Sequence, residues 1–493
     1  MTTSQRPARA THARVGLFVF SVAIAIAVYA ARPTQLPITG DEPHYVIMAD
    51  ALVHDRTLDL RDAYAREART GAIYRAPLNT HVAIVNHRWA PYHAPGLAIL
   101  LAVPFLAGGV AGAKIALCLV AGLLPVSLVG WFGRRMPHAT AVWLTVGVTI
   151  ALPLCFGASQ VYPDLVAGVA TIALALWLID RAPRSRQGAA WLLFWIGAGA
   201  LPWLNVKFLP TTIVPAAGGV VTAMHAERAE RAEKRGSAGS AASALFVARR
   251  VIVCSGLVAI GPASLAAFHL WGVGSPLGPR GGAELTTSFS RAAMMFLGLH
   301  LDESQGMFLQ HPLMLAGIAA SPAFARMRPR AAVLWLALYA SLIVPNSLEL
   351  ARFGGGGPVG RFAWSALWLW AIPIGFVVGD YHDAIARWVK PAVIASLVYQ
   401  ALLAVRWLPD LGVLFPRLEE QLSARDSLFP VGARYALPSF YFWDFSGYWT
   451  YLPNVVAYLV VGGLVAVGAW LSCLGRPAAP WYHEGLLQAR RPE

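Results

Sequence analysis

Long apolar runs, separated by short polar connections, follow one another along most of this chain. A run of about 20 apolar residues can cross a bilayer as an α-helix, whereas a transmembrane β-strand would alternate apolar and polar positions. The continuous runs therefore predict an all-α polytopic membrane protein and exclude a transmembrane β-barrel. Twelve spans are predicted, over residues 15–31, 112–132, 139–157, 163–180, 189–204, 209–224, 246–270, 312–325, 331–347, 361–379, 391–406 and 452–474.

One further apolar stretch, residues 95–109, is short and is interrupted by Pro104 and two glycines. Lys and Arg are enriched in cytoplasmic loops, and the basic sequences QRPARATHAR, GRRMP and DRAPRSRQG all fall on the cytoplasmic side if this stretch does not cross fully. We therefore predict twelve spans with both termini in the cytoplasm, and a half-inserted or interfacial helix over 95–109. If the stretch does cross, the count becomes thirteen and the later topology inverts.

The composition agrees with a membrane protein, because 57% of the residues are hydrophobic and only 13% are charged, against about 25% in a typical soluble domain. The formal net charge of +14 raises the question of a polyanionic partner. The basic residues cluster in the connections between apolar runs, however, as membrane topology requires, so we predict no nucleic-acid partner. The four cysteines lie within or beside apolar runs without a CxxC spacing, which favours small core residues over disulfides or metal ligands.

Residues 1–474 are predicted to form a single transmembrane domain, followed by a cytoplasmic tail over 475–493. Its loops are a first extracytoplasmic segment with interfacial helices over 32–95, a cytoplasmic loop over 225–245, and extracytoplasmic segments over 271–311 and 407–450. The inner loops look like ordinary basic connections, whereas the outer ones carry acids, histidines and arginines. We therefore expect any chemistry on the outer face.

The sequence GDEPHY, directly after the first span, places Asp41 and Glu42 side by side at the membrane exit. Gly40 and Pro43 restrict the backbone around them, and the following HYVIMADALVHD has the pattern of an amphipathic helix lying along the membrane surface. Pro43 suits the first turn of that helix, with an acidic residue near its N-cap. A carboxylate held there and partly desolvated has the properties of a general base.

GDEPHY after the first span, HAPGLAILLAVPF after the outer segment, and GRR at the end of the next span together resemble the GT-C superfamily of membrane glycosyltransferases. The resemblance is to the branch of the aminoarabinose and protein mannosyltransferases, and it covers roughly residues 38–210 well and the later spans loosely. It implies transfer of a sugar from a polyprenyl-phosphate donor, with inversion, to a hydroxyl of a glycan, lipid or protein acceptor. It also implies a bacterial inner-membrane protein whose active site faces outward.

The same resemblance implies roles for particular residues. Asp41, with Glu42 beside it, corresponds to the first-loop acid that deprotonates or orients the acceptor hydroxyl. Asp164 corresponds to a second acid that faces the same cavity and supports acceptor or donor binding. Lys207, at an outer turn, corresponds to a lysine that pairs with the donor phosphate. The alternatives are that Asp164 merely caps a helix and that Lys207 snorkels to lipid headgroups. Further substrate contacts are assigned to His44, Tyr45, His93, Asp302, Glu303, Arg352 and Arg361.

The run RFGGGGPVGRF supports the assignment of Arg352 and Arg361, since glycines let backbone N–H groups approach an anion and Arg binds phosphate through two N–H groups. A flexible loop is the alternative. His44, His81, His87 and His93 show no tight ligand spacing, so no metal site is predicted. No cofactor is required, although some members of the resembled superfamily use a divalent cation such as Mg²⁺ or Mn²⁺.

Two rival functions stay open at this stage. A transporter or lipid flippase would carry ionisable residues within its spans, whereas most of the candidates here lie at outer boundaries. An O-antigen-type polymerase or ligase would rely on outer-loop arginines, and it would leave the Asp41–Glu42 pair unexplained.

Overall fold

The computed structural model describes residues 5–31, 40–74, 77–180, 188–233, 240–279, 285–349, 353, 357–415, 428–429, 433, 435–440 and 448–473. Eight helices in this part of the chain are long and apolar enough to cross a membrane. They are α1 (Gln5–Ala30), α4 (Gly96–Phe132), α7 (Pro163–Asp180), α10 (Ser240–Val273), α14 (Pro329–Ser347), the segment α15–α16 (Arg361–Leu367 and Ala371–Asp380), α17 (His382–Trp407) and α19 (Leu452–Cys473).

The remaining predicted spans also coincide with helices, but their apolar parts are shorter or bent. Helix α5 (His138–Thr149) and the stretch Leu152–Ser159, which begins with α6 (Leu152–Cys155), form one apolar pair bent by 70°. The others are α8 (Gly188–Leu204), α9 (Leu209–Glu233) and α13 (Leu315–Met327). The predicted class, a polytopic all-α membrane protein, is therefore confirmed, while the number of crossings stays a prediction. Helices α9 and α10 also extend into the predicted loop 225–245, because HAERAERAE is rich in strong helix formers.

Helix α4 is broken where the sequence places two adjacent glycines. Gly108 and Gly109 have non-helical backbone angles, and Gly109 has a φ of 57°. The part before the break, which starts at Gly96, is only ~18 Å long at ~1.5 Å per residue, against ~30 Å for the hydrocarbon core of a bilayer. Its length agrees with the prediction that residues 95–109 do not cross the membrane alone.

The middle of the bundle is formed by α7 and the segment α15–α16. In an apolar stretch of 18 residues, 94% of the residues are buried in Arg361–Asp380 and 72% in Pro163–Asp180, but only 6% in α19. Peripheral helices expose large apolar side chains such as Val405 on α17 and Leu459 on α19, as lipid-facing helices do. Helix α7 packs against both α15 and α4.

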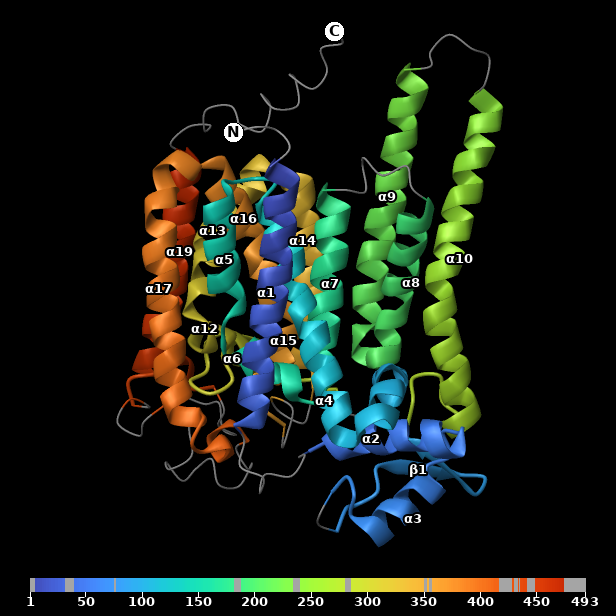
Figure 1. Ribbon diagram of the computed structural model, residues 1–493. Coiled ribbons are helices and arrows are strands. Elements are labelled where there is room, and N and C mark those ends of the chain that lie inside the picture. Colours follow the sequence, from blue (N-terminus) through green and yellow to red (C-terminus); the bar gives the residue numbers. More distant parts are fainter. Residues whose placement is uncertain are drawn as a thin grey trace.

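A small layer lies at one end of the bundle, beside α4 and α10 (Figure 1). It consists of α2 (Glu42–Asp50), a π-helical turn (Ala51–Asp55), α3 (Arg61–Thr70) and the hairpin of β1 (Val82–Val85) and β2 (Arg88–Pro91). Helix α9 ends and α10 begins at the opposite end of the molecule. Since the sequence around that connection is basic, the positive-inside rule predicts that the layer lies on the extracytoplasmic side.

The remaining described α-helices are short and lie in or beside the segment 271–311, which is predicted to be extracytoplasmic: α11 (Phe289–Leu301) and α12 (Met307–Gln310). Strands β1 and β2 pair antiparallel, with Val82 opposite Pro91 and Val85 opposite Arg88. The layer has its own apolar core, in which Tyr45 and Ile47 of α2 pack with Leu101 and Phe105 of α4. This core fixes the layer on the first part of α4.

Helix α2 differs in one respect from the amphipathic surface helix that the sequence predicts. Gly40 has a positive φ of 58° and Pro43 lies in the first turn of α2, as predicted. All nine residues of α2 are buried, however, so the helix does not lie on the surface with one polar face exposed. The pattern misleads because the polar residues of α2 have partners inside the protein, on α3 and α4.

Candidate active site

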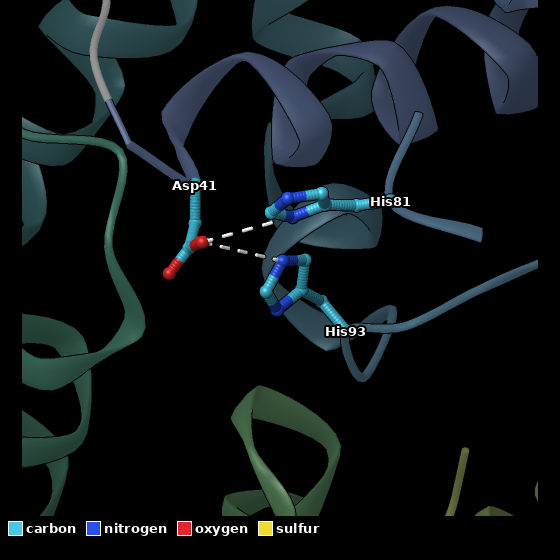
Figure 2. Close-up of side chains that lie close together, drawn as sticks. All are labelled: Asp41, His81 and His93. Atoms are coloured by element: carbon cyan, nitrogen blue, oxygen red, sulfur yellow. Dashed lines mark ion pairs between the residues drawn. The ribbon is translucent and has the colours of Figure 1, made fainter. Parts of the chain in front are cut away.

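Asp41 directly precedes α2, and its two carboxylate oxygens face different groups. Oδ2 lies 3.4 Å from the guanidinium of Arg361. Oδ1 lies 3.8 Å from Nδ1 of His81 and 3.7 Å from Nε2 of His93. Figure 2 shows both histidine rings turned toward the carboxylate. A quarter of the Asp41 side chain is exposed, and the rest of the carboxylate lies among basic groups.

The surroundings keep this carboxylate ionised. Burial by itself would raise the pKa of Asp41, but the charges of His93, Arg361 and His81 outweigh it and hold the pKa well below its usual range. The side chain makes no capping hydrogen bond to α2, and the backbone N–H donates to the Tyr162 hydroxyl at 3.3 Å. The Asp41 carboxylate is therefore directed at the basic groups and not at its own helix.

Arg361 is the first residue of α15 and is buried. A positive charge is unfavourable at a helix N-terminus, so its position needs compensation. At 3.4 Å and an effective dielectric constant of ~20, the Coulomb attraction to Asp41 is about 5 kcal/mol. The guanidinium also lies 4.2 Å above the ring of Tyr162. The Arg361 side chain passes so close to Gly357 that a Cβ at position 357 would lie 2.5 Å from Nε of Arg361. This close contact explains why one position of the sequence RFGGGGPVGRF is a glycine.

A second carboxylate–cation pair lies beside the first. Asp164 is in the first turn of α7, where a negative charge is favourable, and Nζ of Lys207 donates to its Oδ1 at 2.6 Å. Asn205 holds the turn that carries Lys207 by accepting from its backbone N–H. The Lys207 ammonium lies 4.2 Å from the ring of Phe362, the neighbour of Arg361. Arg361 interacts electrostatically with both members of this second pair.

Glu42 has surroundings quite unlike those of Asp41. It is buried, and its Oε1 accepts hydrogen bonds from Nζ of Lys114 at 3.2 Å and from the backbone N–H of Val161 at 2.6 Å. These contacts join α2 to α4 and to the segment before α7. The structure thus places Glu42 where it ties elements together and Asp41 where it faces the basic groups.

The three other layer residues assigned from the sequence surround Asp41. His44 stacks on His81 with ring centroids 3.8 Å apart, and its Nδ1 is hydrogen-bonded to the Tyr64 hydroxyl at 2.7 Å. Burial lowers the pKa of His44 to about 3, so the ring is neutral. The Tyr45 ring lies 4.7 Å from that of His93 and is fully buried, which raises the pKa of its hydroxyl.

Asp302 and Glu303 have a different setting. Both are buried, and the Asp302 carboxylate accepts hydrogen bonds from three backbone N–H groups, those of Ser304, Gln305 and Phe440. Gln305 in turn accepts from the N–H of Gly360, directly before Arg361. This segment supports the start of α15, and Asp302 already uses both carboxylate oxygens. Arg352 lies outside the described residues.

Sequence reasoning assigns no role to His81, Tyr162 or Asn205, which the structure places in the site. Tyr162 stands only two residues before Asp164, so its position was a usable signal. His81 and His93 are twelve positions apart, and only the pairing of β1 with β2 brings them together. The short alternating stretches on either side of Asn86 and His87 were the sequence signal for that hairpin.

No protein-family model and no curated protein matches the sequence. Two solved structures of ArnT from Cupriavidus metallidurans are similar in fold. The one bound to undecaprenyl phosphate is 14% identical, with a TM-score of 0.44, over 93% of this chain and 76% of that chain. The apo structure is 16% identical, with a TM-score of 0.47, over 93% of this chain and 75% of that chain.

Proposed function

We propose that the chain is an integral membrane glycosyltransferase that moves a sugar from a polyprenyl-phosphate donor to an acceptor hydroxyl on the extracytoplasmic face. One observation carries the proposal. Two carboxylate–cation pairs, Asp41–Arg361 and Asp164–Lys207, meet where the central helices α7 and α15 begin, next to the outer layer. A carboxylate that stays ionised can accept the proton of a hydroxyl, and the cations beside it can stabilise the charge of a departing phosphate.

In the proposed reaction Asp41 accepts the proton of the acceptor hydroxyl. The acceptor oxygen attacks the anomeric carbon, the bond between that carbon and the phosphate oxygen breaks, and polyprenyl phosphate leaves with the electron pair. A single displacement inverts the anomeric centre, through a state similar in character to that of glycoside hydrolysis. Asp41 suits this role better than Glu42, because the Glu42 carboxylate is buried and accepts hydrogen bonds from Lys114 and Val161.

The two cations have the properties needed for the phosphate. Lys207 carries three N–H donors and gives one to Asp164, so its ammonium can contact a phosphate oxygen while the pair holds it in place. The Arg361 guanidinium can bind a phosphate through two parallel N–H groups. Asp164 then acts mainly by positioning Lys207, and His44, Tyr45 and His93 shape the acceptor side around Asp41.

The topology belongs to the same proposal. Residues 1–474 would form one membrane domain of the bacterial inner membrane, with the segments 32–95, 271–311 and 407–450 outside and the loop 225–245 and tail 475–493 inside. The layer of α2, α3 and the hairpin would then cover the site from the outer side. A donor of this class meets the site from the membrane, since its polyprenyl chain stays in lipid while its phosphate and sugar reach the interface.

The experiment is a donor screen with protein purified in detergent. Radiolabelled polyprenyl-phosphate sugars are supplied singly, together with a membrane extract that contains glycan, lipid and protein acceptors. We expect one donor to give a labelled product of inverted anomeric configuration and an equal amount of polyprenyl phosphate. Movement of intact donors across liposomes without cleavage would show a flippase instead, and consumption of diphosphate-linked glycans alone would show a polymerase or ligase.

A further inference from the structure

We infer that Asp41, His81 and His93 form a binding site for a divalent metal ion, with Zn²⁺ as the best-suited ion. The ligand-capable atoms of the three side chains lie within 4.8 Å of one another (Figure 2). The existence of this site is independent of the proposed function, and only its role in catalysis rests on it.

The fold holds each of the three side chains by a separate constraint. Asp41 is fixed by the positive φ of Gly40 before it and by the start of α2 after it. His81 directly precedes β1, and the pairing of the hairpin brings it beside the end of β2, where the N–H of Tyr92 donates to the carbonyl of His81. His93 follows immediately and is packed against the buried ring of Tyr45. The hairpin thus converts two distant histidines into neighbours.

The separations are those of ligands around an ion. The distances of 3.8 Å and 3.7 Å from Asp41 Oδ1 to the two ring nitrogens are longer than a hydrogen bond of about 2.7–3.2 Å. Two ligands bound at ~2.1 Å in a tetrahedral zinc site lie ~3.4 Å apart. Small rotations of the side chains would therefore bring all three atoms to bonding distance of one ion.

The charges of the site also call for a cation. Asp41 and Asp164 balance Arg361 and Lys207, and Glu349 adds a negative charge that acts on Lys207. Histidines that bind a metal must be neutral, and with His81 and His93 neutral these described groups have no positive excess with which to attract a phosphate. A divalent ion bound to Asp41 would supply that excess, and it would sit on the opposite side of the carboxylate from Arg361, since Oδ1 faces the histidines and Oδ2 faces the guanidinium.

The donor set decides which ion fits. Two imidazole nitrogens and one carboxylate oxygen suit Zn²⁺, which takes such three-residue sets when a fourth position stays open for water or substrate. Mg²⁺ prefers oxygen ligands throughout, so the site differs from a magnesium site. An acceptor hydroxyl in the open position would have a lowered pKa and would lie beside the Asp41 carboxylate that is proposed to take its proton.

Metal binding is measured without reference to activity. Detergent-purified wild-type protein, stripped with a chelator and dialysed against Zn²⁺, should retain one zinc per chain by elemental analysis. The double variant His81→Gln/His93→Gln should lose it, with zinc affinity falling by more than about 100-fold. His87→Gln is the matched control, since His87 is exposed at the turn of the same hairpin, and it should bind like wild type. Retention of zinc by the double variant, or no zinc in wild type, would overturn the inference.

A second measurement needs no variant and so does not depend on the double variant folding. Co²⁺ added to stripped wild-type protein should give the visible absorption of a four-coordinate site, and Zn²⁺ should displace it. Absence of that spectrum would also overturn the metal site. Full sugar transfer by metal-free protein would remove its catalytic role and leave the proposed function standing, whereas stoichiometric zinc without cleavage of any donor would remove the function and leave the site.

Discussion

Replacing Glu42 by Gln tests whether the two adjacent acids have separate roles. In the wild type the buried carboxylate of Glu42 compensates the buried ammonium of Lys114 at 3.2 Å. A glutamine side chain can still accept from the N–H of Val161, but it leaves Lys114 as a buried charge without its carboxylate. Removing one partner of a buried ion pair costs about 3–5 kcal/mol, so we expect Glu42→Gln to lower the melting temperature clearly.

The second half of the test is the double variant Glu42→Gln/Lys114→Met. Replacing both members of a buried pair by neutral groups is often nearly neutral, so the double variant should recover most of the lost stability. Thermal unfolding in detergent can be followed by intrinsic fluorescence, since the chain has 18 tryptophans. A Glu42→Gln protein as stable as wild type, or a double variant less stable than the single one, would refute the structural role of Glu42.

Three further predictions concern the two carboxylate–cation pairs and the glycine packed against Arg361. Gly357→Ala should slow transfer with the fold retained, because its Cβ displaces the Arg361 side chain; unchanged kinetics would contradict the close packing. Lys207→Met should reduce donor turnover, and adding Asp164→Asn should restore stability without restoring turnover, as a donor titration and a melting curve would show. Asp41→Asn should melt below wild type at pH 7, and the difference should shrink as pH falls below about 4. Folding lowers the pKa of Asp41, so its carboxylate stabilises the folded protein at pH values above the unfolded pKa. This stabilisation is lost as the pH falls toward the lower folded pKa and the group is protonated. A stability difference that grows in acid would contradict the assignment.

The fold class could be predicted from the sequence because apolar run length directly reflects the thickness of a bilayer. Each predicted span coincides with a helix, and the two glycines in 95–109 correctly indicated a break. The exposure of α2 could not be predicted, because Glu42, His44 and Asp50 look like a polar surface until their partners are known. Those partners are far away in the sequence, and periodicity carries no information about them.

In the candidate site, too, single residues could be predicted from the sequence but their contacts could not. Asp41, Asp164, Lys207 and Arg361 could be chosen one by one, because each is a charge at the end of an apolar run. Their pairing depends on which helices start next to each other, which the sequence does not state. The proximity of His81 and His93, on which the proposed metal site rests, could not be predicted, because a hairpin brings these residues together, whereas the ligand spacings used for prediction assume ligands on one local element.

The most direct test of the central assignment is the transfer rate of Asp41→Asn, measured with the donor that the screen identifies. Loss of a general base typically costs about 10²- to 10⁴-fold in rate, so we predict a loss of that size, with donor binding changed only a few-fold and near-UV circular dichroism unchanged. A folded Asp41→Asn protein that transfers sugar at nearly the wild-type rate would contradict the proposed mechanism.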